Sequence, residues 1–241
     1  MKDVRIVVNP FRMMSPKLDS EALRLEELHT KSISESVSLQ EGLLIMISKI
    51  LEMARLLSKA VVSGSQAQMD ACGILGKDVH EQEKLLTRSL ISSEAKTARL
   101  SDVIRFPARL ERIGDLLENI LRCCRIKARD GIPFGDKAHA ELGQLFALLT
   151  DMLVNLRDAF VTTNKFLVDR IVTDGKKLGQ NLQDARLAHW DRLERGFGAP
   201  QASSLYLDIL DSITGINEYM VKMCDRLVVL AEAVEEEEAD R

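Results

Sequence analysis

The sequence predicts an all-α fold made of two tandem three-helix bundle repeats. Hydrophobic residues make up 46% of the 241 residues while aromatic residues make up only 4%, and this mix favours helices packed through aliphatic side chains over a β-sandwich. Apolar residues also recur at helical spacing along most of the chain. Finally, apolar positions in the first half reappear in the second half at a nearly constant offset, which indicates a diverged internal duplication.

The first repeat is expected over residues 20–130, after an N-terminal arm at residues 1–19. Pro10 and Pro16 break any helix in the arm. The helical period begins near Ser20, and turn signals divide the rest of the repeat into helices. The three expected helices span roughly residues 20–62, 66–91 and 96–129.

Turn-forming residues set the limits of these helices. Ser63-Gly64-Ser65 separates the first two, with Ser65 as a plausible N-cap of the second. Pro107 lies inside the third segment, where it predicts either a kink or a helix start nearby. Asp130-Gly131-Ile132-Pro133 ends the third helix.

The second repeat is expected over residues 131–241 and ends in an acidic tail. Ile47 and Leu57 lie 99 positions before Phe146 and Leu156. The offset grows to 103 after a loop insertion, and short loops make the helices of each repeat run up, down and up. The expected helices span roughly residues 136–161, 165–196 and 203–235. The predicted core of the two third helices consists of Ile113, Leu117, Ile120, Ile216, Met220 and Leu227.

Composition also limits the location and partners. The net charge of −4 argues against a nucleic-acid binder. No signal peptide is apparent, and the longest obvious apolar run, Leu43 to Ile47, is far shorter than the ~20 residues that span a bilayer. The cysteines have no CxxC spacing and are interpreted as small buried hydrophobes in a reducing compartment. We therefore expect a cytoplasmic protein that does not span the membrane.

Glu111 and Asp115 are the most informative polar pair. They stand four residues apart on a predicted helix, so their carboxylates share one face, which Glu118 extends. Aligned carboxylates suit a hard metal ion if a facing helix supplies more oxygen ligands. The competing interpretation is a solvated helix face neutralised by Arg112. Gly114 between them costs about 1 kcal/mol relative to alanine, which is tolerated where a helix or a ligand must approach closely.

The run Glu111-Arg112-Ile113-Gly114-Asp115, followed by Asn119-Ile120, resembles the signature of the PhoU family of phosphate-transport regulators. The resemblance covers about residues 20–235. It is closest to the PhoU-like domain of sodium–phosphate cotransporter family proteins, through His189, Arg192-Leu193, Gly196 and Tyr206 to Leu210. It implies an all-helical fold of two three-helix repeats, each with an E(D)xxxD motif on its third helix that binds iron or other metal ions in some members.

The second motif departs from that pattern. Thr214 takes the place of the glutamate and Glu218 that of the aspartate, while Asp208 lies within two turns before Thr214. Asp78 matches a position where family members often carry an acid, and is expected to face the first motif. The cofactor implied is iron, manganese or another divalent or trivalent cation. The candidate metal ligands are Glu111, Asp115, Asp78, Glu218 and Asp208.

The resemblance implies a non-enzymatic, metal-binding regulator that docks to a membrane phosphate transporter or an associated sensor kinase, and a homo-oligomer is compatible with it. Two alternatives stay open: a carboxylate-bridged helical-bundle metalloenzyme, and a metal-free structural adaptor. No nucleophile elbow or Gly-rich phosphate loop is present, so no catalytic residue is predicted. The four histidines are scattered and are expected to be exposed.

Overall fold

The computed structural model describes residues 39–92, 105–162, 164–197 and 199–239, with side chains for residues 41–90, 105–162, 164–197 and 199–227. These residues form helices and connecting turns, and they contain no strand, so the all-α prediction is confirmed. The helices are α2 (Leu39–Ser63), α3 (Gln66–Ser92), α5 (Phe106–Arg129), α6 (Asp136–Thr162), α7 (Lys165–Glu194) and α8 (Pro200–Ala239). The predicted N-terminal arm and the predicted helical segments 20–38 and 96–104 lie outside the described residues.

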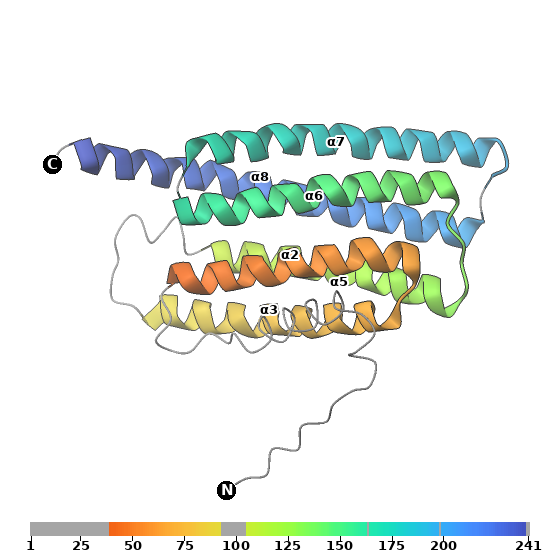
Figure 1. Ribbon diagram of the computed structural model, residues 1–241, viewed down its shortest axis with the longest axis horizontal. Coiled ribbons are helices and arrows are strands. Elements are labelled where there is room, and N and C mark those ends of the chain that lie inside the picture. Colours follow the sequence, from red (N-terminus) through yellow and green to blue (C-terminus); the bar gives the residue numbers. More distant parts are fainter. Residues whose placement is uncertain (1–38, 93–104, 163, 198, 240–241) are drawn as a thin grey trace, which may run out of the picture.

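The helices form two three-helix bundles side by side. Helices α2, α3 and α5 make the first bundle, and α6, α7 and α8 make the second. The bundles meet where α2 packs along α6 and α5 packs along α8, while α3 and α7 lie on opposite outer sides (Figure 1). The predicted architecture of two three-helix bundles is therefore confirmed, whereas the division of the chain into repeats at residue 130 stays a prediction.

Glycine and proline place the helix ends close to where the sequence predicts them. Gly64, Gly131 and Gly196 follow the ends of α2, α5 and α7 with φ angles of 64°, 62° and 77°, a left-handed conformation that favours glycine after a helix. Pro107 stands in the first turn of α5, where its missing N–H has no helical partner to lose. The proline therefore marks a helix start and not a kink.

One hydrophobic core runs through both bundles. The six core residues predicted on the two third helices are all buried, at most 3% exposed. The Phe106 and Phe160 rings, from different bundles, meet edge to face with centroids 5.0 Å apart. Gly215 brings α8 against Leu116 of α5. The four cysteines are buried and free, as expected, and they are Cys72, Cys123, Cys124 and Cys224. None of the described helices combines the length and the apolar character needed to cross a bilayer.

A candidate metal site on the first bundle

A stripe of three carboxylates on α5 faces α3. Glu111, Asp115 and Glu118 follow one another at helical spacing and line a pocket of about 240 Å³ between the two helices. The Glu111 side chain is 22% exposed and that of Asp115 is 43% exposed, so the stripe lies at the bundle surface. The residues that line the pocket are Gly76, Lys77, Val79, His80, Glu111, Gly114, Asp115 and Glu118. We call Glu111, Asp115 and Glu118 the acidic stripe.

Two glycines allow α3 and α5 to approach closely at the acidic stripe. A Cβ atom at Gly76 would overlap the Oε1 atom of Glu118, and one at Gly114 would lie 3.2 Å from Cγ1 of Val79. The absence of both side chains therefore makes room for neighbouring side chains of the first bundle. Helix packing accounts for the glycine inside the first motif, which the sequence left open between a helix and a ligand.

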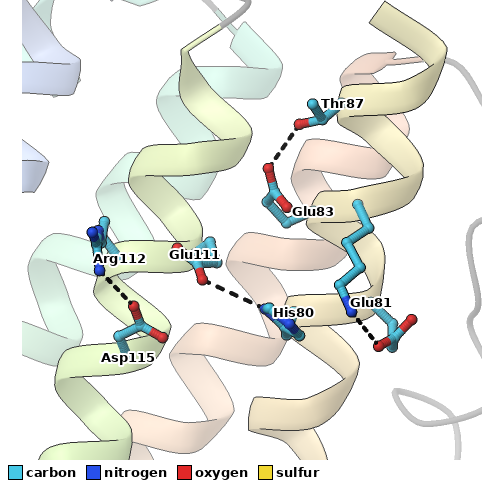
Figure 2. A network of polar contacts seen from close by, with 8 residues as sticks. His80, Glu81, Glu83, Thr87, Glu111, Arg112 and Asp115 are labelled. Atoms are coloured by element: carbon cyan, nitrogen blue, oxygen red, sulfur yellow. Dashed lines mark hydrogen bonds and ion pairs between the residues drawn. The ribbon is translucent and has the colours of Figure 1, made fainter.

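A histidine, and not an acid, is what α3 offers to the first motif. His80 Nδ1 lies 3.5 Å from Oε1 of Glu111, and Figure 2 shows the two side chains pointing toward each other across the gap. The His80 side chain is 54% exposed. His80 was not among the predicted ligands, although its position four residues after Gly76 places both on the same face of α3.

The acidic stripe concentrates negative charge. Burial raises the pKa of Glu118, the charges of Asp115 and Glu111 raise it further, and His80 and Arg125 act in the opposite direction. Asp115 itself is paired with Arg112, whose Nη1 lies 3.1 Å from its Oδ2 (Figure 2). Arg112 therefore neutralises part of the stripe, as the alternative interpretation of the sequence proposed.

Asp78 does not join the first motif. Its Oδ2 lies 3.0 Å from Nζ of Lys49, a lysine on α2 that is 1% exposed. Burial lowers the pKa of Lys49, while the hydrogen bond and charge of Asp78 oppose that change. Asp78 thus forms an ion pair between α3 and the buried Lys49 of α2. It does not line the pocket that Glu111 and Asp115 line.

At the second motif an arginine of α7 contacts the residues around Thr214. Arg186 Nη2 donates to Thr214 Oγ1 at 3.1 Å, and Arg186 Nη1 lies 2.6 Å from Oδ1 of Asp211. Glu218 is 60% exposed and pairs with Lys222 at 3.4 Å. The guanidinium group of Arg186 therefore already supplies a positive charge beside this motif.

Asp208 is far from Glu218 along the same helix. Ten residues separate them on α8, which corresponds to roughly 15 Å at the usual helical rise. Asp208 is exposed and its charge helps to raise the pKa of Cys123 on α5, although burial of that thiol is the larger cause. The structure therefore does not bring these two candidate ligands together.

The two bundles repeat one helix contact with different chemistry. Gly175 on α7 corresponds to Gly76 at the offset of 99, and Val221 corresponds to Glu118 at the offset of 103. A Cβ atom at Gly175 would lie 2.8 Å from Cγ2 of Val221, just as one at Gly76 would meet Glu118. The contact supports the proposed duplication, and a valine in the second bundle replaces a carboxylate of the acidic stripe.

The acidic stripe is open to solvent and does not form an enclosed metal site. Among the described residues, no group of three or more His, Cys, Asp or Glu side chains is arranged to hold a metal ion. A hard cation such as Mg²⁺ keeps several waters and binds through one or two carboxylates. The residues present therefore fit a hydrated cation on Glu111 and Asp115 better than an enclosed ion.

Comparison with solved structures identifies the fold. The chain superimposes on PhoU from Pseudomonas aeruginosa with a TM-score of 0.71 at 14% sequence identity, over 90% of this chain and 99% of that one. For the phosphate transport system regulatory protein PhoU from Streptococcus pneumoniae the TM-score is 0.68 at 18% identity, over 87% of this chain and 95% of that one. A putative PhoU-like phosphate regulatory protein from Shewanella oneidensis MR-1 gives 0.59 at 10% identity, over 80% and 98%.

No family model matches the sequence, and no curated protein matches it. The structural likeness nevertheless extends over nearly the full length of each of the three solved chains. The chain therefore has the PhoU fold, as the resemblance in its first motif led us to expect.

Proposed function

We propose that this chain is a PhoU-like regulator of phosphate transport or phosphate signalling that acts by docking and not by catalysis. The observation that carries the proposal is the shared two-bundle fold, which covers 90% of this chain and 99% of a PhoU chain. Two of the solved chains are a phosphate transport system regulatory protein and a putative PhoU-like phosphate regulatory protein. The partner we propose is a membrane phosphate transporter or an associated sensor kinase, and we place the protein in the cytoplasm, where its four free cysteines stay reduced.

A single hydrated cation on the acidic stripe is the second part of the proposal. Burial, and after it the charges of Asp115 and Glu111, raise the pKa of Glu118, and a cation between the carboxylates would relieve the part that comes from their repulsion. Glu111 and Asp115 would hold an iron, manganese or similar ion, with Asp115 turning from Arg112 toward it. The second motif contributes less because Arg186 already supplies a positive charge there.

Deletion of the gene in its host tests the regulatory function. Loss of a phosphate regulator is expected to change phosphate uptake or the expression of phosphate-starvation genes at high external phosphate, and the wild-type gene should restore both. A matched strain carrying Glu111→Gln with Asp115→Asn separates the role of the stripe from that of the fold. Unchanged uptake and unchanged gene expression in the deletion strain would refute the regulatory proposal.

A metal-free structural adaptor is the second candidate. The Arg112–Asp115 ion pair and the lack of a three-residue ligand group among the described residues favour it. Elemental analysis of protein purified without chelator decides between the two. About one equivalent of transition metal per chain supports the metal-binding regulator, and none supports the adaptor.

A further inference from the structure

A cavity of about 470 Å³ lies at one end of the second bundle. The turn between α5 and α6 and the loop between α7 and α8 reach this same end (Figure 1). Six residues give the cavity its chemical character, and they are Phe134, Lys137, His189, Arg192, Phe197 and Tyr206. None of these residues lines the pocket of the acidic stripe, so the cavity is a separate feature of the molecule.

Aromatic rings form much of the wall. Tyr206 is 1% exposed, and it meets Phe134 edge to face at 6.2 Å and His189 at 4.8 Å between ring centroids. Phe197 lies in the loop after α7 and is 68% exposed. An exposed phenylalanine beside buried rings offers apolar surface to a flat molecule that enters from solvent.

Hydrogen bonds hold the polar part of the wall in place. Arg192 donates two hydrogen bonds to the Glu141 carboxylate, at 2.6 and 2.8 Å, and the Tyr206 hydroxyl donates to the same carboxylate. His189, 8% exposed and thus not an exposed histidine as the sequence suggested, bonds to Ser203 Oγ at 2.7 Å. These partners fix the rings before any ligand arrives, which lowers the entropic cost of binding.

The surroundings of the cavity are weakly positive. Nζ of Lys127 lies 5.3 Å from the centroid of the Phe134 ring, and Lys137 lies in the cavity wall. The charge of Arg192 is balanced by its ion pair with Glu141. Asp136 is the one acidic residue among those that line the cavity. The positive ends of α6 and α8 add to the field, because both helices begin here. The positive field therefore favours a ligand with an anionic group near Lys137 over a ligand with a cationic group.

We propose that this cavity binds a small, flat aromatic molecule that carries one acidic group, such as an aromatic carboxylate. The exposed ring of Phe197 contacts its aromatic body above the buried rings of Phe134 and Tyr206, and Lys137 pairs with its acid. The volume falls within the roughly 300–1,000 Å³ typical of small-molecule sites. The inference goes beyond the proposed regulatory function and does not depend on the acidic stripe.

Calorimetric titration of the full chain with 2-naphthoate tests the proposal, with the neutral 2-naphthylmethanol as the comparison ligand. We expect one equivalent of naphthoate to bind and the alcohol to bind at least about tenfold more weakly, a difference of about 1.4 kcal/mol. Lys137→Ala and Phe197→Ala should each weaken naphthoate binding by about fivefold or more. Both variants change exposed side chains and should keep the fold.

Matched controls and a blocking variant complete the test. Phe166→Ala removes an exposed phenylalanine from the opposite end of α7, and Lys177→Ala removes an exposed lysine from its middle; neither should alter binding. Ala202→Phe fills the cavity from α8 and should abolish binding while the circular dichroism spectrum stays helical. The proposal is overturned by no binding at millimolar naphthoate, by equal binding of the alcohol, or by equal losses in the control variants.

Discussion

At the scale of single residues, Glu118 is the member of the acidic stripe whose ionisation is opposed by its surroundings in the folded protein. Its carboxylate lies against Gly76 and beside two other carboxylates, and its pKa is raised by burial and by the charges of Asp115 and Glu111. A raised carboxyl pKa means that the folded state binds the proton more tightly than the unfolded state. The stability cost of this group therefore appears as the pH rises above about 4.5, the ordinary value for glutamate.

Glu118→Gln should accordingly stabilise the metal-free protein at pH 7 by only about 0.2–0.5 kcal/mol, the size of a like-charge helix pair, because Glu118 is exposed and solvent screens the repulsion. The gain should fade below pH 4.5, because the wild-type carboxyl is then protonated. Urea denaturation at both pH values measures it, with the exposed Asp151→Asn on α6 as the control. A destabilising effect at neutral pH would contradict this account of the stripe.

His189 predicts a pH dependence of the opposite sign. Burial lowers its pKa, Arg192 lowers it further, and Glu141 partly offsets both. The unfolded chain therefore binds a proton below about pH 6.5 that the folded chain binds less readily. The free energy of unfolding should fall as the pH decreases from 6.5.

Chemical denaturation of His189→Gln between pH 8 and pH 5 checks this expectation. The variant should lose less stability over that range than the wild type does. Part of the slope should remain, since burial also lowers the pKa of His139. If the two proteins lost stability in parallel, the slope would have to come from groups other than His189.

At the scale of helices, the sequence could predict which residues share a face but not which neighbour that face meets. Gly76 and His80 are four residues apart and both face α5. Asp78 stands two residues from each, which places it on the other side of α3 at about 100° per residue. It therefore meets Lys49 on α2. Turn residues, in contrast, act locally, and for this reason the helix ends that precede Gly64 and Gly131 were predictable.

The paired glycine contacts give a prediction at the same scale. An alanine at Gly76 displaces the end of the flexible Glu118 side chain, whereas one at Gly175 meets Cγ2 of the short, branched Val221. Gly76→Ala should change the free energy of unfolding little, because alanine favours the helix by about 1 kcal/mol over glycine and this gain offsets the displacement of Glu118. Gly175→Ala should be the more destabilising of the two, since overpacking costs about 1–3 kcal/mol and the same gain in helix propensity offsets only part of it. Urea denaturation of the two variants measures the difference, and a larger loss of stability in Gly76→Ala than in Gly175→Ala would contradict the prediction.

At the scale of the whole molecule, the fold was predictable because the same apolar pattern occurs twice in the sequence, at offsets of 99 and 103. Apolar positions that match at these offsets, such as Leu117 and Met220, are buried in both bundles. The site was less predictable because it depends on contacts between helices. The second motif shows this clearly, since Arg186 lies 28 residues before Thr214 in the chain and contacts it only after α7 and α8 pack.

The two bundles therefore have the same helix arrangement but a different charge at the equivalent contact between their helices. The acidic stripe lies in the first bundle, and at the equivalent contact the second has Val221 beside Gly175. We propose that this asymmetry leaves one cation site per chain, on Glu111 and Asp115, in a protein that acts as a docking scaffold.

Titration with Mn²⁺, followed by anomalous diffraction from crystals grown with the ion, tests that claim most directly. We predict one cation per chain, bound at Glu111 and Asp115, lost in the Glu111→Gln, Asp115→Asn double variant and retained in Thr214→Ala. The double variant should keep its thermal stability without metal, because these side chains lie outside the core. Stronger occupancy at Glu218 than at Asp115, two cations per chain, or no cation in the wild-type protein would contradict the account.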